Sequence, residues 1–329
     1  MRRNHLYTMS SALCLVACGG GGGSEGSIQV VPAPAPSTTP APMPTATPTP
    51  TPAPTFTYGS FDLSQNRVFA GQVATVTTVE RYTSDTAPFY SVESQQASLQ
   101  TSCSTLELSY DASKLLVIRF AGETAVFNPA EVSFTNADGV KWQRTRTVTA
   151  RGDAATFARF PNMEYVYIAE QQVDEDAREP NAAAASRDTM RYFLIGERTR
   201  DGDIPLSGTT NYAVDLNTTR VGRNRGGGFS VFGDVALAID HANGSVTARL
   251  SAQQGSYTTG TTPETATLVF SGIISANGIS GAITSPDSSY TGVFTGNLFG
   301  PRGIEAGMVF TLTRPDGVRA AGRLFGRRR

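Results

Sequence analysis

The chain has 329 residues, a formal net charge of −1 and only 17% charged residues. This balance excludes a generic nucleic-acid binder, which needs a large basic excess, so no nucleic-acid partner is expected. No run of about 20 apolar residues exists, which excludes a transmembrane helix. Thr, Ser, Val and Phe are frequent and glycine reaches 33 residues, a composition that favours short strands and turns over helices.

Residues 1–17 have the pattern of a bacterial export signal. Arg2 and Arg3 give a positive start, and the short apolar stretch Met9–Ala17 follows. The run L-V-A-C at 15–18 then matches the lipoprotein processing pattern, in which the lipid is attached through the cysteine sulfur. We therefore predict acylation of Cys18, with more than one acyl chain and hence stable anchoring in the membrane. An ordinary secretory signal with incidental cysteines is the alternative.

Residues 18–55 have the composition of a tether. The five glycines Gly19–Gly23 come first, and 22 of the 24 residues from 32 to 55 are Pro, Thr or Ala. Such a segment cannot bury enough apolar surface to offset its ordering entropy. Gly19 stands where the common inner-membrane retention signal has Asp, so the predicted location is the outer membrane.

Residues 56–205 are predicted to form a smaller β-rich domain that ends near Pro205. The strand candidates are Val73–Val79, Leu106–Tyr110, Leu115–Phe120, Val132–Thr135, Arg144–Thr149, Glu164–Ala169 and Arg191–Gly196. The polar stretch Glu170–Asp188 predicts a long surface loop.

Residues 206–329 alternate apolar and polar side chains with a period of two, as in 235–240, 246–251 and 308–313. Asn243-Gly244, Asn277-Gly278 and Asp316-Gly317 are turn signals between such runs. About eight strands follow one another, and eight up-and-down strands close into a small barrel that side chains or one small ligand can fill. The predicted fold class is all-β: a β-rich domain followed by an eight-stranded antiparallel up-and-down barrel.

Catalytic motifs are not evident. His241 is the one histidine left after signal removal and is interpreted as a solvated turn residue. The G-x-S-x-G match at 22–26 falls in the tether, without the strand and helix that the motif requires. The acidic runs Asp201-Gly202-Asp203 and 174–176 lack calcium-loop spacing and are interpreted as solvated turns. We predict a protein that is not an enzyme and uses no cofactor or metal.

One loop is a candidate binding site. Arg220, Arg223 and Arg225 cluster in a Gly-rich segment between the first two predicted barrel strands. Loops on a rigid β scaffold often carry binding residues. A solvated basic loop without a ligand is the alternative, because Arg is the usual cation of this chain.

The C-terminal residues resemble a known family. The segments are G-V-F-T-G-N-L-F-G-P (292–301), E-A-G-M-V-F (305–310) and G-R-L-F-G-R-R (322–328). They are similar to the barrel that ends transferrin-binding protein B and its relatives, and 196–212 resembles the segment entering that barrel. Leu298 replaces an aromatic residue of the family pattern, and Met308 stands where a second glycine is usual. The glycines at 292 and 296 are expected to let Phe294 and Phe299 pack at barrel corners.

The resemblance implies a surface lipoprotein that binds a host or environmental ligand, either a protein or a small solute such as one carrying iron or haem. The β-rich domain would be the handle of one lobe, and an outer-membrane transporter would be a possible partner. The alternative is a structural or adhesive envelope lipoprotein without a dedicated ligand. A transmembrane barrel is disfavoured, because the predicted outer faces of late strands hold Thr311, Thr313, Arg319 and Arg323.

Overall fold

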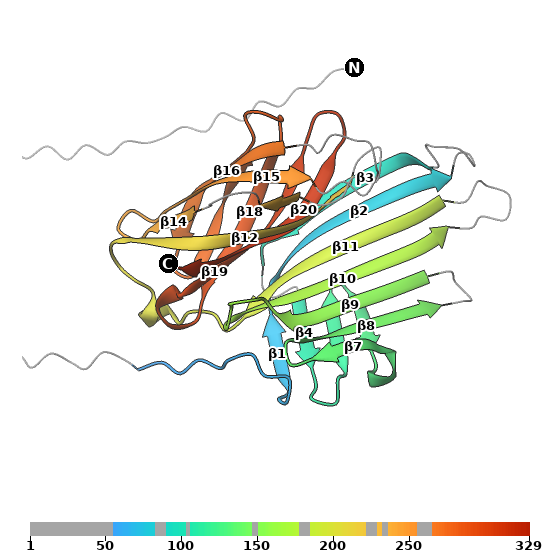
Figure 1. Ribbon diagram of the computed structural model, residues 1–329, viewed down its shortest axis with the longest axis horizontal. Helices are drawn as coiled ribbons and strands as arrows, with labels where there is room; N and C mark the ends of the chain where they lie inside the picture. The colour runs from blue at the N-terminus through green and yellow to red at the C-terminus, as the bar shows by residue number, and fades with distance from the viewer. Residues whose placement is uncertain are drawn as a thin grey trace, which may run out of the picture. The chain divides into compact units, whose positions relative to one another are not determined.

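The computed structural model describes residues 55–82, 90–102, 106–146, 151–177, 185–221, 229–231, 236–254 and 265–329. Ala53–Arg329 form one compact unit. The all-β prediction is confirmed, since the regular elements within these ranges are β-strands and short 3-10 turns (Figure 1). Within the same ranges, no helical segment has the length and apolar character needed to cross a membrane.

A long antiparallel sheet is built from seven strands in the order β3-β2-β11-β10-β9-β8-β7. The strands are β2 (Gln72–Tyr82), β3 (Tyr90–Gln100), β7 (Val132–Asn136), β8 (Gly139–Arg146), β9 (Arg151–Arg159), β10 (Val166–Ala177) and β11 (Ala185–Gly196). β10 and β11 pair along twelve residues each, so the centre of this sheet is the hairpin between them.

A second sheet has four strands in the order β1-β4-β5-β6. They are β1 (Arg67–Ala70), β4 (Leu106–Tyr110), β5 (Leu116–Phe120) and β6 (Glu123–Phe127). Side chains from both sheets share one core, in which Trp142 and Phe127 are fully buried and Tyr110, Phe157 and Tyr167 form edge-on or tilted ring pairs. Edge-on aromatic packing of this kind adds stabilisation beyond the buried area.

The eight-stranded barrel is confirmed. It consists of β12 (Thr209–Val221), β14 (Ala236–Asp240), β15 (Ser245–Gln254), β16 (Thr265–Ser275), β17 (Gly278–Thr284), β18 (Thr291–Phe299), β19 (Glu305–Thr313) and β20 (Arg319–Arg328). Each strand pairs antiparallel with the next, and β20 pairs with β12 to close the ring. The short strand β13 (Phe229–Val231) pairs with β12 and β15. Apolar side chains such as Leu268, Phe270 and Phe310 fill the interior.

The outer surface of the barrel packs on one face of the long sheet. Val309, Ala321 and Phe325 of β19 and β20 share a core with Val76 and Tyr192 of β2 and β11. Arg323 points out of the barrel, as predicted, but it does not reach solvent, because the long sheet covers it and its side chain is 3% exposed. Its Nη2 donates to Glu170 Oε2 at 3.0 Å, and its guanidinium lies over the ring of Tyr192.

Glu305, the acidic residue of the E-A-G-M segment, joins the barrel to the long sheet. Its carboxylate is fully buried and accepts hydrogen bonds from the backbone N–H groups of Glu164, Tyr165 and Val166 at 2.6, 2.8 and 2.9 Å. Burial raises the pKa of Glu305, and the three N–H groups together with Arg327 oppose that rise. The carboxylate thus satisfies three donors at the start of β10.

Three predictions were wrong: a loop, an acidic turn and the packing around two glycines. The predicted loop Glu170–Asp188 instead consists mostly of β10 and β11, with residues 178–184 outside the described ranges. The acidic run 174–176 is therefore part of a strand. The glycines at 292 and 296 face Leu312 and Met308; Phe294 and Phe299 instead pack closely on Gly281 and Gly307. The proposed division near Pro205 remains a prediction.

Candidate functional site

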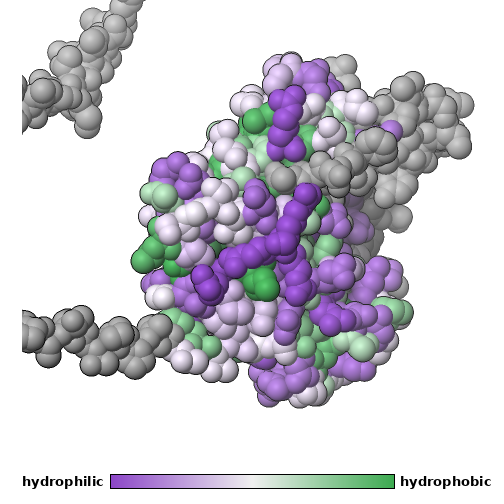
Figure 2. Space-filling view, turned by 60° about the vertical axis from the view of Figure 1, so that its left-hand side comes forward, coloured by the Kyte–Doolittle hydropathy of each residue, from purple (hydrophilic) through white to green (hydrophobic). Residues whose placement is uncertain are grey.

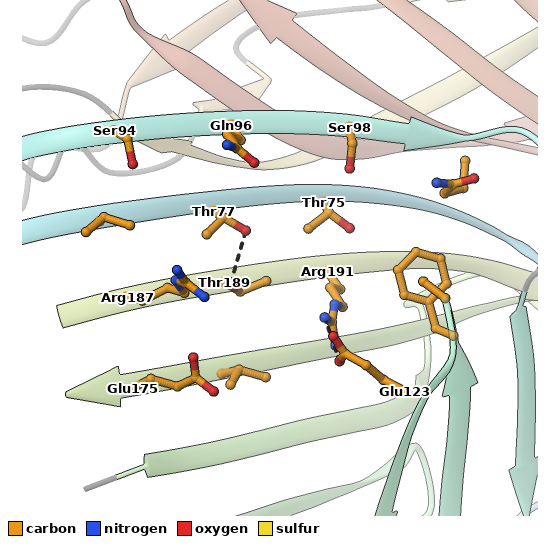
Figure 3. A pocket seen from close by; sticks show the side chains of 15 residues that line it. Thr75, Thr77, Ser94, Gln96, Ser98, Glu123, Glu175, Arg187, Thr189 and Arg191 are labelled. Carbon is orange, nitrogen blue, oxygen red and sulfur yellow. Dashed lines mark hydrogen bonds and ion pairs between the residues drawn. The ribbon is translucent and has the colours of Figure 1, made fainter. Parts of the chain in front are cut away.

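One face of the long sheet is an open polar surface beside the four-stranded sheet. It forms a depression of about 460 Å³, which we call the polar trough (Figure 3). Strands β2, β3, β10 and β11 form its floor, and the β5–β6 turn borders one end. Its polar lining consists of Thr75, Thr77, Ser94, Gln96, Ser98, Gln100, Glu123, Glu175, Arg187, Thr189 and Arg191.

The trough follows from alternation along the strands. On β2, Val76 points toward the barrel, while its neighbours Thr75 and Thr77 point into the trough. The register sets Gln96, Thr77 and Thr189 side by side on β3, β2 and β11. Thr77 Oγ1 and Thr189 Oγ1 are 3.1 Å apart and share a hydrogen bond. The floor is therefore a row of hydroxyl and amide groups rather than an apolar surface.

Arg191 is the most constrained charge in the trough. Its side chain is only 13% exposed, and its Nη2 donates to Glu123 Oε2 at 2.9 Å. Its Nη1 donates at 3.0 Å to Oε1 of Gln171, which is itself 1% exposed. The guanidinium also lies over the Phe120 ring, 5.5 Å from its centroid. These contacts fix the orientation of the guanidinium plane.

Two buried polar atoms on the trough floor have no hydrogen-bond partner. They are Nε of Arg191 and Oγ1 of Thr75, and the two residues occupy directly opposed positions of β11 and β2. A buried polar group without a partner costs free energy, so each such group in a native protein calls for an explanation. A polar group of a ligand placed here would satisfy both atoms.

A second depression of about 260 Å³ adjoins the first and shares Phe120, Glu123 and Arg191 with it. Arg144 also lines it and is already neutralised. Its Nε and Nη2 both bond to Oδ2 of the buried Asp153, at 2.9 and 2.6 Å. Arg144 is thus a structural cation, whereas Arg191 has its carboxylate partner on an exposed turn.

The lining of the two depressions is polar and carries charges of both signs. Neither depression is lined by a histidine or cysteine that could act as base or nucleophile. Among the described residues, no group of three His, Cys, Asp or Glu side chains could hold a metal ion. The trough carries two arginines, Arg187 and Arg191, and two glutamates, Glu123 and Glu175. A lining of balanced charge and many hydroxyls suits a polar ligand of low net charge.

The predicted binding loop lies largely beyond what the structure describes. Arg220 belongs to β12, whereas Arg223 and Arg225 fall outside the described residues, as does the predicted lipidation site Cys18. Of these residues only the backbone of Arg220 is described, and β12, to which it belongs, is not one of the strands that form the trough. No sequence signal predicted the trough, because its floor combines two strand pairs, β2–β3 and β10–β11, that lie far apart in the chain.

The remaining candidates of the sequence have structural partners. His241 Nε2 lies 3.1 Å from Thr210 Oγ1. Burial and the nearby Arg328 lower the pKa of His241. The acidic run at 201–203 forms a 3-10 turn, η3 (Asp201–Asp203). Oδ2 of Asp203 accepts hydrogen bonds from Tyr58 Oη and from the backbone N–H of Arg302.

No family model and no curated protein matches this chain. Among solved structures, transferrin binding protein B from serogroup B Neisseria meningitidis is similar over 78% of this chain, with 13% identity and a TM-score of 0.42. This chain spans 44% of the length of that protein. A mutant of transferrin binding protein B from Haemophilus parasuis is similar over 80% of this chain and 77% of its own, with 12% identity and a TM-score of 0.36.

The N-lobe of lactoferrin binding protein B from Moraxella bovis is also similar. The likeness covers 78% of this chain and 99% of that domain, with 13% identity and a TM-score of 0.38. These structures come from the family that the C-terminal residues resemble, and at such identities the likeness concerns the fold alone.

Proposed function

We propose that this chain is a non-enzymatic surface lipoprotein, anchored in the outer membrane through Cys18, that binds a ligand in the polar trough. One observation carries the binding part of this proposal: Arg191 Nε and Thr75 Oγ1 lie buried and unpartnered on the trough floor. The L-V-A-C run and the Pro-Thr-Ala tether support the anchoring part.

The trough favours a polar surface as its ligand. Hydroxyl and amide groups on β2, β3 and β11 offer hydrogen bonds over a broad area, and such contacts fix orientation and specificity. The similar solved proteins are named for binding transferrin and lactoferrin. Host iron-carrying proteins are therefore the first class of ligand to test, with a small iron- or haem-containing solute as the second.

The binding test compares matched variants of the mature chain. We expect one of transferrin, lactoferrin, a haem carrier or free haem to bind the immobilised chain. Arg191→Gln and Thr75→Val should weaken that binding about tenfold each, roughly the loss of one buried hydrogen bond to a charged or polar group. Arg119→Gln and Thr247→Val replace exposed residues of other strands and should leave it within about twofold. Absence of binding to the whole panel, or equal losses in all four variants, would refute the assignment.

The anchoring test uses the living cell. Cells fed an alkyne-tagged fatty acid should label the wild-type chain and not the Cys18→Ser variant. Protease added to intact cells should remove the folded domain while periplasmic controls survive. Full protection would place the chain in the periplasm and favour the structural envelope role. An outer-membrane transporter partner is part of the proposal, and crosslinking in intact cells would identify it.

A further inference from the structure

Two of the three described sheets have free strand edges, and one of these edges borders a depression. In the barrel, β20 pairs with β12, so no strand ends that sheet. The barrel end of the molecule, which comes forward in Figure 2, carries hydrophilic side chains across its middle. The long sheet ends at β3 and β7, and the four-stranded sheet ends at β1 and β6. The second depression is lined by three consecutive residues of β6, Glu123, Thr124 and Ala125. Because consecutive side chains point to opposite faces of a strand, the depression lies along the edge of β6.

The turn before β6 determines which of its backbone groups face β5. Ala121 and Gly122 have positive φ angles of 51° and 82°, as in the two-residue type I′ turn of a hairpin. The residues on either side of such a turn, here Phe120 and Glu123, form a hydrogen-bonded pair, and bonded positions then alternate along the strands. The backbone groups of Glu123 and Ala125 therefore point toward β5.

Thr124 and Val126 occupy the alternate positions of β6, so their N–H and C=O groups point away from β5 toward the free edge. One hydrogen bond agrees with this orientation, because the Val126 carbonyl oxygen accepts from Arg144 Nη1 of β8. The Arg144 guanidinium thus caps the edge at Val126. Within the described ranges, the backbone of Thr124 has no comparable partner, and Thr124 is exposed. One N–H and one C=O of the edge are therefore open at Thr124.

The charged side chains beside this edge are already paired. Arg191 and Glu123 line the depression and form an ion pair, and Figure 3 shows the two side chains reaching toward each other from β11 and the β5–β6 turn. Arg144 is held by Asp153. The aromatic residue of the lining is Phe120, and the Arg191 guanidinium covers its ring, so that face is not free to stack on a planar ligand. The site therefore suits a neutral ligand that brings its own hydrogen-bonding groups, as a peptide main chain does.

We propose that β6 binds an extended peptide segment of the ligand, which pairs with Thr124 as an added strand of the four-stranded sheet. Addition of a peptide to a free sheet edge gives main-chain hydrogen bonds for affinity and pockets for alternate side chains. The peptide residue bonded to Thr124 points outward, and its two neighbours, opposite Glu123 and Ala125, point into the second depression. Because the charges there are balanced, these two neighbours are uncharged. Arg144 limits the pairing to this end of β6. Peptide binding here rests on the binding function proposed for the adjoining trough and names its class of ligand.

The experiment uses the mature chain, residues 18–329, with Cys18→Ser, so that it is prepared without lipid. The probe is a phage-displayed library of random heptapeptides, from which we expect the immobilised chain to enrich binding peptides. Thr124→Pro removes the outward N–H and leaves the pairing with β5 intact, because proline is tolerated at an edge position that donates to no strand. This variant should bind the enriched peptides at least about tenfold more weakly. Thr124→Ala keeps the N–H and should bind them within about twofold of the parent.

Amide hydrogen exchange gives a second readout that needs no substitution. In the free chain the Thr124 amide should exchange faster than the Ala125 amide, which is bonded to β5. An enriched peptide should slow exchange at Thr124 at least about tenfold and leave exchange at Ala125 little changed. This readout decides the proposal if Thr124→Pro fails to fold. Fluorescence of Trp142, the one tryptophan of the chain and a buried ring of the core beneath β6, reports folding.

Each outcome supports or overturns peptide addition at β6. Failure to enrich any peptide, equal losses in Thr124→Pro and Thr124→Ala, or unchanged exchange at Thr124 would overturn it. The proposed function is judged separately. If a carrier protein binds, and Arg191→Gln weakens that binding while Thr124→Pro does not, the trough binds its ligand in another way and peptide addition is wrong. If peptides bind through Thr124 and no member of the carrier panel binds, the peptide site stands and the assigned ligands are wrong.

Discussion

Removing the Glu305 carboxylate should destabilise the packing of the barrel on the long sheet. Glu305→Ala leaves the backbone N–H groups of Glu164, Tyr165 and Val166 without their acceptor. All three donors lie at the start of β10, whose pairing with β11 forms the centre of the sheet. The substitution thus acts at a joint between two cores rather than inside one of them.

The structure sets the size of the loss. A buried donor that loses its acceptor costs about 1–3 kcal/mol, so three donors give an upper limit of about 9 kcal/mol. Two effects reduce this value. The raised pKa of Glu305 shows that burial disfavours its charge, and the alanine variant no longer carries that cost. Water can also reach the space that the carboxylate leaves. We expect a net loss of about 2–4 kcal/mol in the free energy of unfolding.

Urea unfolding of the mature chain at pH 7 measures this loss. Glu305→Gln keeps one acceptor oxygen, so its free energy of unfolding should fall less than that of Glu305→Ala. The control is Glu107→Ala, which removes a carboxylate that is 49% exposed and paired with Arg119; it should change stability by less than about 1 kcal/mol. If Glu305→Ala is no less stable than this control, the three hydrogen bonds do not hold the joint.

Three further predictions concern stability. Gly307→Ala would place a Cβ 2.6 Å from Leu194 Cδ1 and should cost about 1–3 kcal/mol, whereas Gly278→Ala, with nothing nearer than 3.5 Å, should be close to neutral by thermal unfolding. Burial would raise the pKa of Asp287, but hydrogen bonds from Thr267 and Ser285 lower it to about 2. Asp287→Asn should therefore reduce the free energy of unfolding at pH 7 by about 1 kcal/mol, a small value because the side chain is exposed. Acid unfolding should show the stability difference between variant and wild type disappear as the pH approaches 2. Burial lowers the pKa of His241, so on acidification the unfolded state binds a proton before the folded state does, and stability should fall as the pH drops below about 6.5. The melting temperature should therefore decrease less between pH 7.5 and pH 5.5 in His241→Gln than in the wild type.

The barrel was predictable because its two sides differ sharply. Leu237, Ile239, Val246 and Leu250 point into a filled interior, and the residues between them are more exposed. The period of two therefore appears directly in the sequence. Turn chemistry marks the ends of the strands, as at Gly317, whose φ is +97°. Side-chain alternation and turn residues are local properties, and they suffice for an up-and-down barrel.

The long sheet was harder to predict, because its polar trough weakens the alternation. β3 has the sequence Y-S-V-E-S-Q-Q-A-S-L-Q, with polar residues on both faces, and it was not predicted as a strand. The far halves of β10 and β11 have the same character and were assigned to a loop. The burial of Arg323 could not be predicted either, since it depends on the long sheet covering the barrel.

The two faces of the long sheet therefore have different roles. Side chains on one face pack against the barrel and stabilise the fold, and side chains on the other face line the trough. Val76 and Tyr192 point toward the barrel and are almost fully buried, so changes there create cavities or overpack a core. Thr75 and Thr77 point the other way, into a trough whose groups are not committed to a core. Substitutions at its exposed positions Ser94, Gln96 and Ser98 should thus change ligand binding at small cost in stability, since few packed atoms are lost there. Arg191 differs, because Glu123 and the buried Gln171 hold its side chain. Related proteins could then vary the ligand while keeping the joint at Glu305 and Gly307, because each of these two residues is constrained by the contact between sheet and barrel.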